Sequence, residues 1–213
     1  MILILGKNSQ LNKEFSKIYK KKKISLSSKN LNFLNQKKFT IILKKFNPNV
    51  VLNFAAFNDL DKAEDSKENF LINAKSLKYI SNYCKKKNIL LIHVSTDNVF
   101  DGKKFFYTES SKTNPINKYG KAKLQGEKII KKIWYKHIIL RTSWLYSSHS
   151  KNFFSTIQKL IFNKKTNIIF GATDHISSPT SARSLAQAID FLVRLYLSKS
   201  KLKFGLYNFV NKG

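Results

Sequence analysis

The sequence predicts an α/β fold with a doubly wound parallel sheet, and two observations support this. Short apolar runs at 2–5, 50–54, 89–94 and 138–140 alternate with amphipathic helical stretches, which is the order that produces parallel sheets. The first run passes directly into a turn at Gly6 and then a helical stretch. Strand, glycine turn and helix form the opening of a Rossmann-like dinucleotide-binding unit.

Length and composition are those of a folded protein with a substantial core. The chain has 213 residues and 42% hydrophobic content, enough for one sizeable domain. No apolar run approaches the length of a membrane span, so we expect no signal peptide, no anchor and no membrane partner. The single cysteine, Cys84, has no internal disulfide partner and stands among apolar residues. It predicts a small buried side chain and a reducing, cytoplasmic location.

The formal net charge of +28 raises the possibility of nucleic-acid binding. Nearly all of the positive charge is lysine, however, and the only arginines are Arg141, Arg183 and Arg194. Phosphate-reading proteins favour the forked guanidinium. The lysines are scattered among abundant Asn, Ile and Phe, as in the product of an AT-biased genome, and the runs 20–23 and 85–87 suit helix ends. We therefore expect no nucleic-acid partner.

The first strand and helix predict the pyrophosphate site of a dinucleotide. The turn after strand 2–5 contains Gly6, Ser9, Gln10 and Leu11, and a helix is expected over 11–22. Backbone N–H groups of such a turn and of the helix start receive phosphate oxygens. We assign these four residues to cofactor binding.

The second strand, 23–27, ends without the carboxylate that would accept the ribose hydroxyls of NADH. Ser27, Ser28 and Lys29 stand there instead. A cation without a carboxylate suits the 2'-phosphate of NADPH, although a surface lysine would look the same in the sequence. NADPH is favoured and NADH stays open.

Small residues follow the third strand. A helix over 39–46 and a strand over 50–54 lead to Ala55, Ala56 and Phe57. Small side chains at a strand end let the sugars of a cofactor pass close to the backbone, although they also suit strand-to-helix packing. A long helix is expected over 66–87.

The residues that carry chemistry follow the strand 89–94. Thr96 stands at its carboxyl end, where open α/β sheets bind ligands. Tyr119 and Lys123 are four residues apart, so a helix places them on one face. A lysine cation beside the phenol would lower the tyrosine pKa toward the working pH. This set predicts carbonyl/alcohol redox chemistry, whereas His93, inside the strand, is expected to be a core or supporting residue.

The later elements are expected to be a helix over 119–134, a strand over 138–140, a strand over 168–170, a helix over 182–197 and a last strand over 206–210. The turn at 177–183 contains Pro179 between hydroxyl residues, which is a good helix start.

The stretches around these residues resemble a known family. They are Ser-Thr-Asp-Asn-Val-Phe-Asp-Gly at 95–102, Pro-Ile-Asn-Lys-Tyr-Gly-Lys-Ala-Lys at 115–123 and Arg-Thr-Ser-Trp-Leu-Tyr at 141–146. They are similar to the extended short-chain dehydrogenase/reductase superfamily, and within it to the dTDP-4-dehydrorhamnose reductase family. The resemblance implies an NAD(P)H-dependent oxidoreductase that reduces the C4 ketone of dTDP-4-dehydro-L-rhamnose to dTDP-L-rhamnose, a step of nucleotide-sugar and polysaccharide biosynthesis.

The resemblance also implies roles for individual residues. Tyr119, Lys123 and Thr96 would be catalytic, with Tyr119 and Lys123 also on the cofactor. Asn32 and Phe33 would flank the adenine, and Asn73 would support the backbone of the site. Substrate residues would be Thr96, Asp97 and Trp144. Where the family has two further loop glycines, this chain has Ser9 and Asn12.

The predicted organisation is a dinucleotide-binding domain over 1–146 and a mixed segment over 147–213. The second segment is part substrate lobe and part packing on the first domain, truncated relative to the family. A homodimer is expected, with a Mg²⁺ ion at its contact as a family option for which no ligand can be named here. Two alternatives stay open: a non-catalytic homologue that acts as a binding subunit, and another nucleotide-sugar reductase or epimerase.

Overall fold

The computed structural model describes residues 1–31, 33, 35–149, 153–162 and 177–212. Its centre is a six-stranded parallel sheet in the order β2-β1-β3-β4-β5-β8. The strands are β1 (Ile2–Leu5), β2 (Lys23–Leu26), β3 (Val50–Asn53), β4 (Leu90–Thr96), β5 (His137–Thr142) and β8 (Gly205–Asn208). The α/β prediction with a doubly wound parallel sheet is confirmed.

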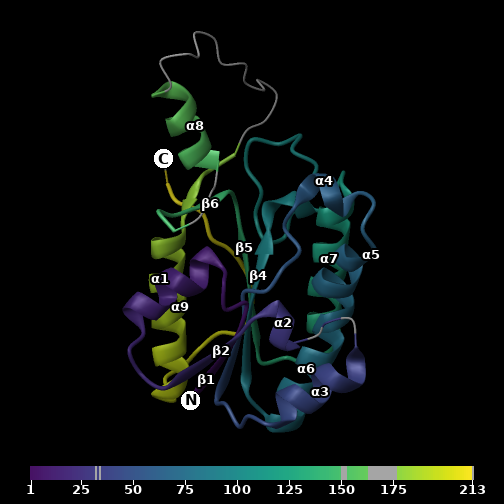
Figure 1. Ribbon diagram of the computed structural model, residues 1–213, viewed down its shortest axis with the longest axis vertical. Helices are drawn as coiled ribbons and strands as arrows, with labels where there is room; N and C mark the ends of the chain where they lie inside the picture. The colour runs from purple at the N-terminus through teal and green to yellow at the C-terminus, as the bar shows by residue number, and fades with distance from the viewer. Residues whose placement is uncertain (32, 34, 150–152, 163–176, 213) are drawn as a thin grey trace.

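Helices cover both faces of the sheet (Figure 1). One face carries α1 (Gln10–Ile18) and α9 (Ala182–Leu197), and the other carries α3 (Gln36–Lys44), α6 (Ser76–Lys87) and α7 (Lys118–Ile133). The other helical elements are α2 (Ser28–Leu31), α4 (Leu60–Ala63), α5 (Lys67–Phe70), the 3-10 turn η2 (Asp97–Val99) and α8 (Phe153–Ile161).

The four central strands are buried on both faces, because each face meets a layer of helices, whereas the edge strands β2 and β8 are half-buried. β1, β3 and most of β4 and β5 are fully buried. Alternate strand residues therefore enter two separate cores, one under α1 and α9 and one under α3, α6 and α7. Cys84 lies in the second core with no exposed surface, as predicted.

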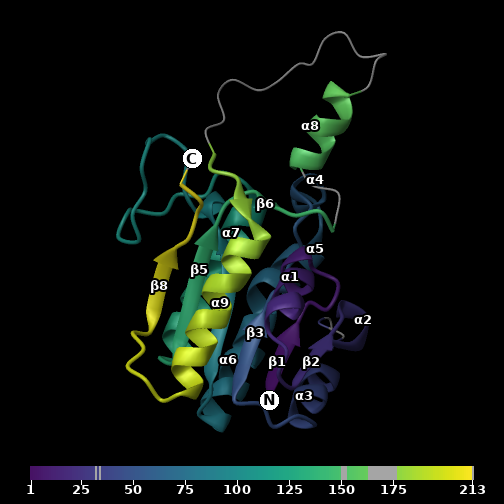
Figure 2. The same cartoon turned by 90° about the vertical axis from the view of Figure 1, so that its left-hand side faces the viewer.

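The carboxyl-terminal segment contributes to the main sheet. β8 pairs in parallel with β5, and α9 packs beside α1 (Figure 2). Two short strands, β6 (Leu145–Tyr146) and β7 (Thr180–Ser181), form a second small sheet beyond the carboxyl ends of the main strands. The division into 1–146 and 147–213 stays a prediction, and the predicted strand 168–170 lies outside the described residues.

Three predicted boundaries are wrong. The helix expected over 66–87 is interrupted by a π-helical turn at η1 (Leu71–Lys75). α1 ends at Ile18, so the lysine run 20–23 belongs to the following turn and the start of β2. α3 starts at Gln36, earlier than expected, because the Asn35 side chain accepts a hydrogen bond from the Lys38 N–H and caps the helix. The run 85–87 does end α6.

Candidate active site

The turn after β1 lies against the end of β3 and requires glycine at its first position. Gly6 has a φ of +104°, and a Cβ there would lie 2.8 Å from the carbonyl carbon of Phe54 and from the Ala55 nitrogen. Both the backbone angle and the space exclude a side chain. The tight turn brings the start of α1 to the carboxyl ends of β1 and β3.

Ser9 and Asn12 replace two glycines of the related loops, and both are used structurally. Ser9 caps α1, with its Oγ accepting from the Asn12 N–H at 3.1 Å. The buried Asn12 amide donates to the Lys7 carbonyl at 2.7 Å. Each polar side chain is therefore turned back into the loop by a local hydrogen bond, and the turn keeps its shape without the glycines.

The other two predicted turn residues have different surroundings. Gln10 donates from its amide to the Leu145 carbonyl at 2.9 Å and accepts from the Ser147 hydroxyl at 2.9 Å, which ties α1 to β6. The side chain of Leu11 is in the core. Only its backbone N–H, in the first helical turn, can serve an anion.

At the end of β2 the structure places no carboxylate among residues 27–31. Ser27 hydrogen-bonds to Asn30 at 2.6 Å, and Lys29 is exposed. Phe33, predicted to flank the adenine, is largely buried in the core against Phe39, with ring centroids 5.3 Å apart. Its predicted partner Asn32 lies outside the described residues.

The loop after β3 is held by a buried asparagine of the π-helical turn. Asn73 accepts from the Phe57 N–H at 3.2 Å and donates to the Phe57 carbonyl at 2.8 Å. The bulge of η1 aims this side chain, and π-bulges often occur at functional sites. Ala55 is half-buried and Ala56 is exposed, so small side chains line this part of the surface beside Gly6.

Thr96, Asp97 and Tyr119 lie together at the carboxyl end of β4. The Thr96 hydroxyl hydrogen-bonds to the Tyr119 phenol and lies 3.1 Å from an Asp97 carboxylate oxygen. The pKa of Tyr119 is raised to about 12, mainly by burial and to a smaller extent by the Asp97 charge, and the Thr96 hydrogen bond opposes this shift.

Lys123 is buried one turn further along α7. Its ammonium donates to the Val94 carbonyl at 2.6 Å and lies 3.4 Å from Nε2 of His93. Burial lowers the pKa of Lys123 to about 8, and the Glu127 carboxylate opposes that shift. The expected lowering of the Tyr119 pKa by Lys123 is therefore wrong for the protein without ligands, because desolvation outweighs any such attraction.

Gly120 lets the start of α7 lie directly on the η2 turn. A Cβ at this position would be 2.1 Å from the carbonyl oxygen of Asn98. The Asn117 side chain accepts from the Gly120 N–H at 2.7 Å and donates to the Asn98 side chain at 3.0 Å. This contact fixes Tyr119 against Thr96.

A buried ion pair stands behind these residues. Arg141 of β5 makes two hydrogen bonds with Glu127 of α7, at 3.0 and 2.7 Å. Ser95 of β4 donates to the same carboxylate at 2.6 Å. The pair and its hydrogen bonds fix α7 on the sheet, and the sequence analysis assigned no role to Glu127. The spacing of Tyr119, Lys123 and Glu127 at i, i+4 and i+8 was the signal for it.

Trp144, the predicted substrate residue, has a strained backbone. Its φ is +35°, which is uncommon for a large side chain, and its carbonyl accepts from the Thr180 N–H at 3.3 Å. Such strain clusters at functional sites. The residue is half-buried between β5 and β6, at the same end of the sheet as Thr96.

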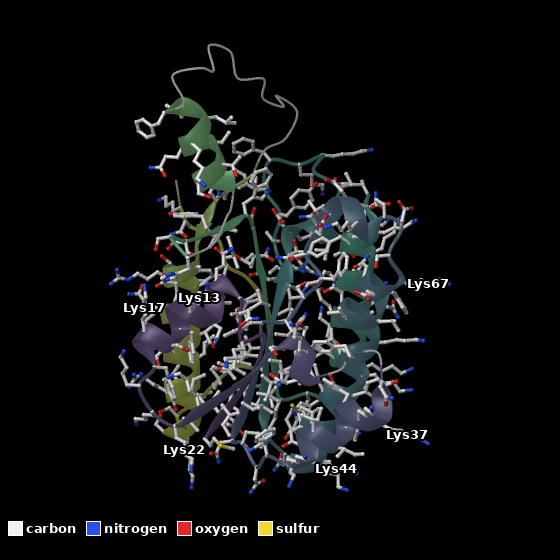
Figure 3. All side chains as sticks on the ribbon, viewed as in Figure 1. Lys13, Lys17, Lys22, Lys37, Lys44 and Lys67 are labelled. Atoms are coloured by element: carbon white, nitrogen blue, oxygen red, sulfur yellow. The ribbon has the colours of Figure 1, made fainter. Side chains whose placement is uncertain are left out.

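Within the described residues, no group of three or more His, Cys, Asp or Glu side chains gathers as a metal site. In the same part of the chain, no helix is long and apolar enough to cross a bilayer. The labelled lysines of Figure 3 project outward from α1, α3, α5 and the turn before β2 on different sides of the molecule. They do not form one basic face.

Comparison with known proteins identifies the family. The model of the RmlD substrate binding domain matches residues 1–213. The chain belongs to the RmlD substrate binding domain family. Among RmlD-family relatives, the dTDP-4-dehydrorhamnose reductase of Aggregatibacter actinomycetemcomitans is 30% identical, covering 99% of this chain and 73% of its own. The dTDP-4-dehydrorhamnose reductase of Salmonella typhimurium is 36% identical, and the match covers 85% of this chain and 60% of the relative.

Solved RmlD-family structures have the same architecture. A dTDP-4-dehydrorhamnose reductase from Clostridium acetobutylicum has a TM-score of 0.89 at 32% identity, and one from Bacillus anthracis in complex with NADP has a TM-score of 0.89 at 29% identity. This chain covers 74% of each. The chain thus spans about 60 to 74% of the length of these relatives.

Proposed function

We propose that the protein reduces the C4 ketone of dTDP-4-dehydro-L-rhamnose to dTDP-L-rhamnose with NADPH. The observation that carries the proposal is the arrangement of Thr96, Tyr119 and Lys123 at the carboxyl end of β4, beside the Gly6 turn. Reductases of this name are 30 to 36% identical to the chain, and one of the structural neighbours is described with NADP. The reaction would take place in the cytoplasm.

The residues at the Gly6 turn fit a dinucleotide. A Cβ at Gly6 would enter the β3 end, the α1 N-terminus has first-turn N–H groups, and Ser9 turns its hydroxyl into the loop rather than outward. Gly6, Ser9, Gln10 and Leu11 would hold the pyrophosphate mainly through their backbone. The carboxylate-free end of β2, with the exposed Lys29, suits a 2'-phosphate.

In the proposed mechanism Tyr119 donates a proton to the substrate carbonyl oxygen, and Thr96 orients that carbonyl. NADPH, when bound, supplies the hydride for the carbonyl carbon. The raised pKa of Tyr119 keeps its phenol protonated at neutral pH, so it holds the proton that the carbonyl oxygen needs. The Thr96 hydroxyl, already directed at the phenol, hydrogen-bonds to the same oxygen. Lys123 would bind the ribose of the nicotinamide nucleotide.

The experiment is an NADPH titration followed by a turnover assay. Saturable binding, with NADH as comparison, tests whether the turn with Ser9 and Asn12 accepts the cofactor. Tyr119→Phe should then lower kcat by at least about 100-fold because the proton donor is lost, with NADPH affinity nearly unchanged. A Tyr119→Phe protein with most of its activity would contradict the assignment, and a folded protein without binding would favour the non-catalytic alternative.

The remaining parts of the proposal concern the ligand contacts, the partners and the organisation of the chain. A dTDP-sugar is the substrate class, with Asp97 and Trp144 among its contacts, and Ala55, Ala56 and Phe57 face the cofactor. Adenine contacts are proposed for Asn32 and Phe33. The homodimer and the two-segment organisation over 1–146 and 147–213 are proposed on the same resemblance. The absence of a nucleic-acid partner is proposed on the scattered lysines and the scarcity of arginine. Sedimentation of the purified chain tests the dimer.

A further inference from the structure

A directional chain of hydrogen bonds leads from the loop after β3 to Lys123. It begins at the Ala55 N–H, which donates to Oδ1 of Asn53 at 3.3 Å. With Oδ1 used in this way, the amide nitrogen of Asn53 faces Nδ1 of His93 at 3.0 Å. The opposite amide orientation would place two N–H groups against each other at Ala55.

The orientation of Asn53 decides which nitrogen of His93 carries the proton. An amide nitrogen only donates, so Nδ1 of His93 must accept, and the proton of the neutral ring is on Nε2. His93 and Asn53 are both buried. Burial and the nearby Lys123 charge hold the pKa of His93 well below its usual range, so the ring is neutral at physiological pH.

The Nε2–H then faces Nζ of Lys123 at 3.4 Å. An ammonium group has no acceptor, whereas a neutral amine has one lone pair. Nζ already donates to the Val94 carbonyl at 2.6 Å, which either form can do. The His93 contact is thus favourable only for the neutral amine.

We propose that His93 is a positioning residue for Lys123: fixed by Asn53 with its proton on Nε2, it stabilises the neutral amine and lets Lys123 gain and lose a proton near neutral pH. One nearby charge favours the protonated form of Lys123 instead. Glu127 on the next turn of α7 favours the ammonium, but Arg141 of β5 is bonded to that carboxylate. Tyr119, one turn earlier on α7, is neutral at this pH.

The consequence for the reaction rests on the proposed function. After Tyr119 gives its proton to the substrate oxygen, a phenolate remains and must be reprotonated before the next cycle. A Lys123 ammonium that readily releases one proton would be able to pass it toward the phenolate: its N–H bond breaks, the phenol O–H bond forms, and water that enters when product leaves would restore the ammonium. A permanently charged lysine would do this poorly.

The test needs neither cofactor nor substrate, so its failure is distinguishable from failure of the proposed reaction. The ¹⁵N spectrum of histidine-labelled full-length protein reports the tautomer of His93, assigned by its absence in His93→Phe. Lysine ¹³Cε titration reports the pKa of Lys123, assigned with Lys123→Met. We expect protonated Nε2 and unprotonated Nδ1 in the wild type. A protonated Nδ1 would overturn the proposal.

Three variants separate positioning from packing. His93→Phe keeps a ring but no N–H, and should raise the Lys123 pKa by about one unit, while His93→Gln, whose amide N–H has similar reach, should restore it. Asn53→Asp should move the His93 proton to Nδ1; only the tautomer is read from this variant, because its new carboxylate would itself raise the Lys123 pKa. A purely structural role predicts a lower unfolding midpoint with an unchanged Lys123 titration, which would refute the inference. If His93→Phe does not fold, the His93 tautomer in the wild type and in Asn53→Asp decides: a wild-type proton on Nδ1, or a proton that stays on Nε2 in Asn53→Asp, would overturn the inference.

Discussion

Replacing Gly120 by alanine should damage the site more than it damages the fold. The new Cβ would lie 2.1 Å from the Asn98 carbonyl oxygen, 2.9 Å from its carbon and 3.0 Å from Cβ of Pro115. Ordinary contact begins at 3.4 Å, so helix and turn must separate by about 1.3 Å. Two of the three obstructing atoms are backbone, which cannot rotate away. Tyr119, the preceding residue, moves with the helix.

The magnitudes decide the sign of the effect. Alanine gains about 1 kcal/mol over glycine inside a helix, but overpacking costs about 1–3 kcal/mol, so the net loss of stability is small. A displacement of about 1 Å between reacting groups can cost about 100-fold in rate. We therefore expect Gly120→Ala to lower kcat/KM by roughly two orders of magnitude in a protein that remains folded.

The assay compares kcat/KM for reduction of the sugar nucleotide with urea unfolding of the same samples. Gly102→Ala is the control for steric contact, because a Cβ there meets nothing within 4 Å; unlike Gly120, Gly102 has a positive φ, of +72°. It should lose about 1 kcal/mol of stability and keep its activity. If Gly120→Ala retained kcat/KM within about threefold, the contact between Gly120 and Asn98 would not position Tyr119.

The remaining predictions concern stability. Glu127→Gln should lower the free energy of unfolding by about 3 kcal/mol, because Arg141 would keep a buried charge without its partner. Asp190→Asn, which breaks the more exposed pair with Arg194, should lower it by under about 1 kcal/mol. Equal urea midpoints for the two variants would contradict this difference. Lys123→Met should raise the free energy of unfolding at pH 7 by about 3 kcal/mol, because a pKa lowered from 10.5 to about 8 corresponds to that penalty for the buried ammonium. The folded pKa of Lys123, about 8, is below its ordinary value of 10.5, so the unfolded chain binds more protons between these values. Wild-type stability should therefore rise with pH across this window, and an advantage of the variant that persists at pH 10.5 would refute the reasoning. Asp101 has a pKa lowered to about 2 by hydrogen bonds from Tyr107 and Asn114, so its contribution is present above about pH 4 and is lost as the pH falls toward 2; Asp101→Asn should flatten that part of a melting-temperature profile, and an unchanged slope would contradict it.

Continuous apolar runs in the sequence predict the central strands, because these strands are buried on both faces, and helical periodicity predicts most helices. Continuous apolar runs such as Ile2–Leu5 result from that burial. The π-helical turn at Leu71–Lys75 could not be predicted in this way, because one extra residue in a helical turn leaves the apolar pattern almost unchanged. Its effect depends on the contact between Asn73 and Phe57, which are distant in sequence.

The candidate site likewise combines features that the sequence predicts with features that it does not. Thr96, Tyr119 and Lys123 follow from strand end and helix spacing, and the structure brings them to one end of β4. The direction of the Tyr119 pKa shift did not follow, because it depends on how much water is excluded around the phenol. The contact of His93 with Asn53 did not follow either, because the sequence does not show that neighbouring strands place these two polar side chains side by side.

The position of β8 has a consequence for how the chain acquires its structure. β8 pairs with β5, yet residues 143–204 lie between them in the sequence. During synthesis from the amino terminus, the backbone of β5 has no partner on one side until Gly205–Asn208 have been made. An unpaired apolar strand is prone to associate with other chains. Protein molecules that are shortened before β8 should therefore collect in aggregates even though every proposed catalytic residue is present in them.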